Sequence, residues 1–167
     1  MNETKIIILR GNSGSGKSTI AKALQKRFGY GTMLISQDII RREMLYVKDG
    51  VNTKAISLLM DLINYGRSNC DIIILEGILN ATWYKELFDL LHQEFEHRIY
   101  AYYFDLPFEE TLIRHQQKSN CNDFGEAEMR DWWKEKDYIG IIKEKILTKD
   151  LSKDEIANMI YTDLTIK

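Results

Sequence analysis

The stretch that decides the fold is Gly11-Asn12-Ser13-Gly14-Ser15-Gly16-Lys17-Ser18. It matches the phosphate-binding pattern G-x-x-x-x-G-K-[ST] and lies between an apolar run, 5–9, and a segment of helical period, 17–28. Glycines allow such a loop to turn tightly, so that consecutive backbone N–H groups point at phosphate oxygens, and the following helix adds the positive end of its dipole. The motif in this context predicts a binding site for a nucleoside triphosphate.

The residues of this loop have different expected roles. Lys17 supplies a positive charge to the β and γ phosphates, and the Ser18 hydroxyl supplies a ligand for Mg²⁺. Thr19 is expected to lie beside the phosphates. The rest of the phosphate cradle is expected to come from Gly11, Asn12, Ser13, Gly14, Ser15 and Gly16.

Around the loop, short apolar and β-branched runs alternate with longer segments of helical period. This alternation is typical of βαβ units and a parallel sheet. We predict an α/β three-layer sandwich, in which about five parallel strands lie between layers of helices. The strands are expected at 5–9, 32–35, 71–75, 98–104 and 144–147. The helices are expected at 17–28, 39–46, 52–68, 81–95, 108–117, 126–137 and 153–164.

The composition is typical of one globular domain. The chain has 167 residues, of which 44% are hydrophobic and 29% charged, and these proportions are sufficient for a core and unlike those of a disordered chain. The sequence contains neither an internal repeat nor a low-complexity or Pro/Gly-rich linker that would mark a boundary. We therefore predict a single domain over 1–167.

Charge, cysteine content and hydropathy argue against several other classes. There are 23 Lys and Arg residues against 25 Asp and Glu residues, and the net charge of -2 is unlike that of a protein that binds long nucleic acid. Cys70 and Cys121 form no C-x-x-C pair, which argues against a disulfide scaffold or a structural zinc site. The longest aliphatic runs, 6–9 and 72–75, are far shorter than the ~20 residues of a membrane span. We expect a cytoplasmic protein without a membrane partner.

The phosphate loop alone does not distinguish a GTPase, an ATP-driven machine and a kinase. The guanine motif Asn-Lys-x-Asp is absent, and the D-x-x-G at Asp137 and the D-F-G at Asp123 occur in the wrong context. ATP-driven remodelling domains are usually larger and carry an acidic pair after the third strand, whereas the sequence here is Leu75-Glu76-Gly77. Elimination favours a kinase.

A second group of polar residues follows the second predicted strand. Asp38 and Arg41 are three residues apart and share one face of the helix expected there. Ligands of open parallel sheets bind beyond the carboxyl ends of the strands, so Asp38, Glu76 and the phosphate loop should face one crevice. Asp38 could take the proton of an acceptor hydroxyl and Arg41, or the adjacent Arg42, could hold negative charge. The alternative is that Asp38 only caps a helix and forms a surface ion pair.

Residues 6–46 resemble the beginning of the small P-loop kinases that phosphorylate hydroxyl groups: polynucleotide kinase, zeta toxin and chloramphenicol phosphotransferase. This resemblance implies ATP as the donor and Asp38 as the base for the acceptor hydroxyl. The spacing of Asp38 and Arg41 is similar to that in polynucleotide kinase, where the Arg contacts a phosphate of the acceptor. Ser36-Gln37-Asp38 and Leu75-Glu76-Gly77-Ile78 also resemble segments of uridine kinases, which implies that Glu76 lies near the metal and the acceptor.

Many kinases close a mobile basic segment over the nucleotide, and we expect a small helical lid at about 114–130. The resemblance implies that Arg114 approaches the adenine or the phosphates and that Lys118, or a residue beyond it, reaches the γ phosphate. Lys118 stands where an Arg is usual, and the acidic residues nearby leave a solvated helix and loop as the alternative.

One ring of the pair Trp132-Trp133 is expected to pack in the core, and stacking on an acceptor is the alternative.

These observations predict a kinase that transfers the γ-phosphoryl group of MgATP to a hydroxyl of a small molecule or of a nucleoside or nucleotide. A nucleoside monophosphate kinase and a 5′-hydroxyl polynucleotide kinase remain alternatives, although Arg residues are absent between Asn52 and Tyr65. A third alternative is an ATP-binding regulatory protein without turnover. The sequence does not indicate the acceptor or the oligomeric state.

Overall fold

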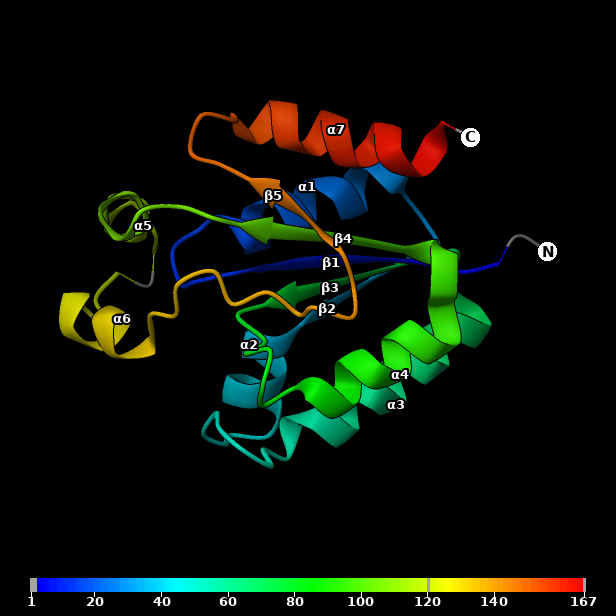
Figure 1. Cartoon of the computed structure of the whole chain (residues 1–167), viewed down its shortest axis with the longest axis horizontal. Helices are drawn as coiled ribbons and strands as arrows, with labels where there is room; N and C mark the ends of the chain where they lie inside the picture. The colour runs from blue at the N-terminus through cyan, green and yellow to red at the C-terminus, as the bar shows by residue number, and fades with distance from the viewer. Residues whose placement is uncertain (1–2, 120, 167) are drawn as a thin grey trace.

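The computed structural model describes residues 3–119 and 121–166, and within this part of the chain five parallel strands form one sheet (Figure 1). The strands are β1 (Lys5–Gly11), β2 (Thr32–Ser36), β3 (Ile72–Gly77), β4 (Ile99–Phe104) and β5 (Glu144–Leu147). Their order across the sheet is β2-β3-β1-β4-β5, and each neighbouring pair is parallel. The phosphate loop therefore follows the central strand.

Helices cover both faces of the sheet, as Figure 1 shows. They are α1 (Lys17–Phe28), α2 (Gln37–Ile39), α3 (Ala55–Asn69), α4 (Lys85–Phe95), α5 (Phe108–Gln116), α6 (Glu126–Trp132) and α7 (Lys153–Thr165), with a π-helical turn η1 (Ile40–Met44) and a 3₁₀ turn η2 (Glu96–Arg98). The α1 and α7 helices lie on one face and α3 and α4 on the other, whereas α5 and α6 lie beyond the carboxyl ends of the strands (Figure 1). The predicted three-layer α/β sandwich is confirmed.

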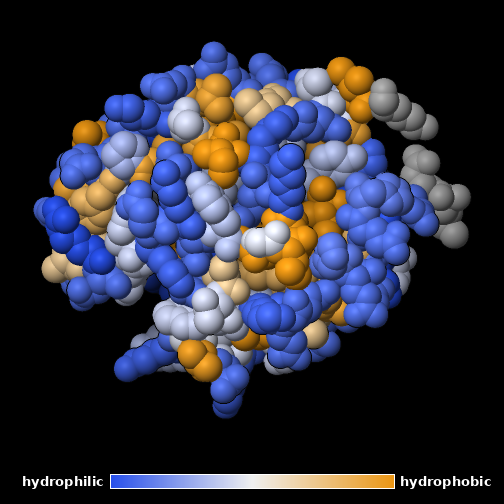
Figure 2. Space-filling model, in the orientation of Figure 1, coloured by the Kyte–Doolittle hydropathy of each residue, from blue (hydrophilic) through white to orange (hydrophobic). Residues whose placement is uncertain are grey.

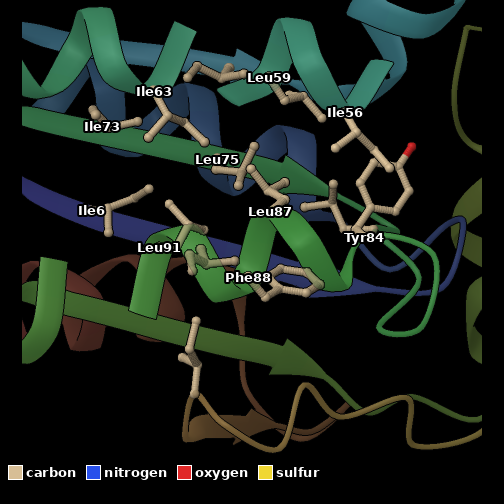
Figure 3. Packing of buried hydrophobic residues seen from close by; sticks show 14 of the residues in the cluster. Ile6, Ile56, Leu59, Ile63, Ile73, Leu75, Tyr84, Leu87, Phe88 and Leu91 are labelled. Atoms are coloured by element: carbon tan, nitrogen blue, oxygen red, sulfur yellow. The ribbon is translucent and has the colours of Figure 1, made fainter. Parts of the chain in front are cut away.

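The two apolar layers follow from the alternation of side chains along the strands. In β1, Ile6 and Ile8 belong to the layer under α3 and α4, whereas Ile7 and Leu9 belong to the layer under α1 and α7. All four side chains are fully buried. Figure 3 shows the first layer, in which Ile56, Leu59 and Ile63 of α3 and Leu87, Phe88 and Leu91 of α4 meet Ile6, Ile73 and Leu75 of the sheet. Because residues 6–11 of the central strand are buried, the sheet holds the phosphate loop on a rigid base.

Several predicted helix bounds are wrong, and side-chain hydrogen bonds explain two of the differences. The helix predicted at 126–137 ends at Trp132, because the Asn12 side chain accepts from the Lys134 N–H at 2.9 Å and donates to the Lys134 carbonyl at 2.8 Å. The helix predicted at 81–95 begins only at Lys85, because the side-chain oxygen of Asn80 accepts from the N–H groups of Thr82 and Trp83 and holds them in a turn. The helix predicted at 52–68 likewise begins at Ala55, and the one predicted at 39–46 is the short α2 helix continued by η1.

The fully buried guanidinium of Arg10 joins three segments at the carboxyl edge of the sheet. It donates to the Leu79 carbonyl, the Asp137 carbonyl and carboxylate, and the Glu144 carboxylate, at 2.7–3.1 Å. Its five N–H donors thus make five hydrogen bonds. Asp137, whose D-x-x-G motif has no support from its sequence context, is an ion-pair partner of Arg10 in the fold.

Hydrophilic residues cover most of the face shown in Figure 2, and apolar residues reach this surface in smaller, separate patches. Among the helices of residues 3–119 and 121–166, none has both the length and the apolar character that crossing a membrane requires.

Candidate active site

The loop between β1 and α1 has a backbone that requires glycine at two positions. Gly14 has a φ of +80°, and a Cβ atom there would lie 2.4 Å from the Thr111 carbonyl oxygen of α5. Gly16, with a φ of +96°, precedes the first turn of α1 in a left-handed conformation that other residues rarely adopt. The loop therefore packs against α5 on one side. On the other side it leads into the N-terminus of α1, whose free N–H groups are suited to bind phosphate groups.

The ammonium group of Lys17 lies across this loop. Its Nζ donates to the Asn12 carbonyl at 2.8 Å and to the Ser15 hydroxyl at 3.1 Å, and the residue is only 7% exposed. Burial lowers the pKa of Lys17 to about 8, although the negative charge of Glu76 partly opposes this shift. A buried cation held only by neutral oxygens lacks a counter-charge in direct contact, and triphosphate oxygens could provide one.

The lowered pKa of Lys17 predicts a pH-dependent affinity for MgATP. Below pH 8 the ammonium is charged, so the affinity should be constant there; above pH 8 binding must be accompanied by proton uptake, and Kd should rise by up to about tenfold per pH unit. Equilibrium titration with a non-hydrolysable ATP analogue between pH 6.5 and 9.5 measures this. Lys17→Arg should weaken binding and flatten the profile, whereas Lys85→Gln, which removes an exposed lysine of α4 that lines neither cavity, should leave the pH at which the affinity begins to fall unchanged. A flat profile for the unmodified protein would show that Lys17 keeps its proton throughout this range.

Beside the loop, two hydroxyl groups from α1 and β2 meet the carboxylate of Glu76 from β3. Glu76, at the end of β3 and 4% exposed, accepts from the Ser18 hydroxyl at 3.1 Å and from the Ser36 hydroxyl at 2.7 Å. Within the described residues, no cluster of three or more His, Cys, Asp or Glu side chains could hold a metal by itself. One hydroxyl and one carboxylate nevertheless fit Mg²⁺, which keeps several waters and takes further ligands from substrate phosphates.

These groups open into a cavity of about 1130 Å³, which is large enough for a nucleoside triphosphate and part of an acceptor. Ser15, Gly16, Ser18 and Thr19 of the predicted nucleotide-binding residues line it, together with Asp38, Glu76, Arg114 and Lys118. Gly14 and Lys17 are buried behind this surface, and Ser13 is partly exposed. The structure therefore brings most of the predicted site residues to one place.

Asp38 lies opposite the loop with its side chain 55% exposed. Arg41 Nη2 is 3.2 Å and Arg42 Nε is 3.7 Å from the same carboxylate oxygen of Asp38. Arg42 lines the main cavity, whereas Arg41 does not; Arg41 also donates to the Val47 carbonyl and lines a second cavity. The predicted pairing of Asp38 with Arg41 is present, and Arg42 is the arginine that reaches both spaces.

The predicted lid contributes two cations to the main cavity. Arg114 donates to the Ser15 carbonyl at 3.0 Å and to Glu110 at 2.9 Å, so its guanidinium lies directly on the phosphate loop. Burial lowers the pKa of Lys118, while the charges of Glu76 and Asp38 favour its protonated form. Arg130, at the far end of the predicted lid, instead pairs with Glu126 and lies over the Phe108 ring, and it lines neither cavity.

Some residues of the site were missed by the sequence interpretation. Ser36, which orients Glu76, follows directly from the rule that strands end at the site, because it is the last residue of β2. The wall formed by 149–153 lies just after the end of β5 and could have been found by the same rule. Trp83, which lines the second cavity, has no signal of this kind.

A parallel sheet in this order, with a phosphate-binding loop after its central strand and helices on both faces, defines the α/β fold of the small P-loop kinases. The chain belongs to the family described as "AAA domain", whose profile matches residues 6–138. No curated protein sequence matches the chain.

Similar solved structures include several kinases, all below 20% identity. The APS kinase of Mycobacterium tuberculosis, solved with AMPPNP and APS, has a TM-score of 0.68 at 19% identity, and the match covers 100% of each chain. A gluconokinase from Sinorhizobium meliloti 1021 has a TM-score of 0.67 at 14% identity, over 98% of this chain and 93% of that one. The shikimate kinase of Acinetobacter baumannii, solved with shikimate, has a TM-score of 0.65 at 19% identity, over 99% and 97%. The resemblance to small P-loop kinases is thereby confirmed at the level of the fold.

Proposed function

We propose that the protein is an ATP-dependent kinase that transfers the γ-phosphoryl group to a hydroxyl of a small molecule or of a nucleoside or nucleotide. The observation that carries this proposal is the position of Asp38. Its exposed carboxylate lines the same cavity as Ser18, Glu76 and Lys118, so a potential base for an acceptor faces the groups suited to hold a triphosphate.

The roles of the side chains follow from their charges and positions. MgATP would supply the phosphoryl group and the divalent charge that this chemistry needs. The loop N–H groups and Lys17 would hold the phosphates, and Ser18 with Glu76 would hold the metal. Asp38 would orient the acceptor hydroxyl and take its proton. Lys118, Arg114 and Arg42, which line the main cavity, would offset the negative charge on the transferring group.

Two further observations support a kinase over an ATP-driven machine. The similar structures cited above are named as kinases, and two of them were solved with a small molecule that is not a nucleoside triphosphate. The end of β3 carries one carboxylate, Glu76, and it accepts hydrogen bonds from the Ser18 and Ser36 hydroxyls. We also propose that 114–130 acts as a lid, because Arg114 and Lys118 approach the cavity from this segment.

The proposal is tested by measuring ADP release from MgATP against a panel of hydroxyl compounds: nucleosides, mononucleotides, 5′-hydroxyl oligonucleotides, sugar acids and polyols. One class should raise turnover far above the rate without acceptor, and the product should carry a new phosphate ester. A product with a new phosphoanhydride would instead identify a nucleoside monophosphate kinase. Binding of MgATP without stimulation by any acceptor would favour a regulatory ATP-binding protein.

A further inference from the structure

A second cavity, of about 460 Å³, lies on the other side of the phosphate loop. Gly11 and Asn12 of the loop form one wall, and Arg42 lines both cavities, so the two spaces meet beside Asp38. The sequence contains three tryptophans, and all of them line this cavity together with Tyr103: Trp83, Trp132 and Trp133. Its volume is in the usual range for a small-molecule site.

These rings are not part of the apolar core. Trp83 is 38% and Trp132 41% exposed, whereas large aromatic rings are normally used to fill cores. Polar contacts hold their backbones in place: Asn80 accepts from the N–H of Trp83, and Asn12 fixes the segment directly after Trp133. Aromatic surface that is fixed and solvent-facing at the edge of a site is suited to stack against a planar ring.

The charged residues around the rings favour an anion. Arg41 and Arg42 stand at the mouth toward Asp38, and this one carboxylate is the ion-pair partner of both. Two of the acidic groups of the lining are engaged by other residues: Asp49 accepts from the Tyr84 hydroxyl and Asp137 from Arg10. Lys134 also lies 3.4 Å from Asp137. Over the whole lining, four basic residues stand against three acidic ones, an excess of one positive charge: Arg41, Arg42, Lys48 and Lys134 against Asp49, Asp131 and Asp137.

We propose that this second cavity, the tryptophan cavity, binds the acceptor, and that the acceptor is a hydroxyl compound with a planar ring and an anionic group, of the kind that nucleoside monophosphates represent. The inference rests on the proposed function. The ring stacks on the tryptophans and the anion pairs with Arg41 and Arg42, whose planar groups suit phosphate oxygens. The acceptor oxygen then forms the bond to the γ phosphorus, ADP leaves, and the hydroxyl proton passes to Asp38.

Because every tryptophan of the chain lines the cavity, intrinsic tryptophan fluorescence reports binding without any need for turnover. The nucleotide site is first saturated with a non-hydrolysable ATP analogue. The probes are the 3′- and 5′-monophosphates of uridine and guanosine, the two free nucleosides, and ribose 5-phosphate. At least one nucleoside monophosphate should change the emission with a Kd ten or more times lower than that of its nucleoside and of ribose 5-phosphate.

Trp83→Ala and Trp132→Ala should each weaken this binding by about tenfold, because stacking on one ring is lost, and should leave the KM for MgATP unchanged. Both rings are more than a third exposed, so neither change opens a core cavity. Tyr30→Ala, which removes a fully exposed ring outside both cavities, is the matched control and should have no effect.

The outcomes separate the two proposals. Tight binding of a nucleoside monophosphate without phosphoryl transfer would support the proposed ligand of the tryptophan cavity and contradict the proposed kinase activity. ADP release with a ringless polyol, and no fluorescence response to any nucleoside monophosphate, overturns the ligand class and leaves the kinase intact. Equal affinity for a nucleoside and its monophosphates overturns the role assigned to Arg41 and Arg42.

Discussion

Asp38→Asn is expected to lower kcat for phosphoryl transfer by about 10²–10⁴-fold and to leave the Kd for MgATP within a factor of about three. Asparagine keeps the size and the hydrogen-bonding oxygen of the side chain but cannot take the proton of an acceptor hydroxyl. The substitution should not unfold the protein, because the carboxylate is 55% exposed and its ion pairs are of a kind worth about 0–1 kcal/mol. The measurement is ADP release with the best acceptor of the panel, beside direct binding of an ATP analogue.

Asp61→Asn is the matched control, because it removes an exposed carboxylate of α3 that lines neither cavity. It should retain the activity of the unmodified protein. If Asp38→Asn retained turnover within about threefold, Asp38 would not be the base and its place beside the loop would be that of a helix cap with a surface ion pair. A loss of MgATP binding in this variant would also contradict the assignment, because it would place Asp38 on the nucleotide.

The parallel sheet could be predicted because its signals are local. The runs 5–9 and 71–75 are nearly all aliphatic, as strands covered on both faces should be, and the helical period of 56–63 marks the stripe that α3 buries. The bounds of 126–137 could not be predicted in this way, because the helix ends where Asn12, more than a hundred residues earlier, binds the backbone of Lys134. A tertiary hydrogen bond overrides the local helical preference there.

In the candidate site, too, the parts with local sequence signals could be predicted and the parts formed by tertiary contacts could not. The phosphate loop is a contiguous motif, and Asp38 and Glu76 lie within two residues of the end of a strand, so one topological rule brings them together. The tryptophan cavity is formed by residues far apart in the sequence, and a sequence pattern does not show that Trp83 and Trp132 line one cavity. The single domain, the cytoplasmic location and the roles of the individual site residues stay predictions.

The second large effect is expected for Arg10→Met, which should lower the free energy of unfolding by about 3–5 kcal/mol. Methionine fills much of the same space but leaves the Glu144 carboxylate, 1% exposed, without its cation, and the Asp137 carboxylate, 9% exposed, with only Lys134 at 3.4 Å. The Asp137 and Leu79 carbonyls would also lose their donor. Urea denaturation followed by circular dichroism measures the change as a lower midpoint at an unchanged slope.

The cause of this loss of stability can be tested by also neutralising the two carboxylates that pair with Arg10. If the loss comes from uncompensated burial, the triple variant Arg10→Met, Asp137→Asn, Glu144→Gln should recover most of the stability, whereas Arg10→Lys, which keeps the charge without the planar fork, should fall between the two. A triple variant as unstable as Arg10→Met would instead show that the guanidinium matters through packing against Phe88 and Tyr103, over whose rings it lies. Because Arg10 fixes the segment at Asp137 that lines the tryptophan cavity, Arg10→Lys should also weaken acceptor binding more than it weakens MgATP binding.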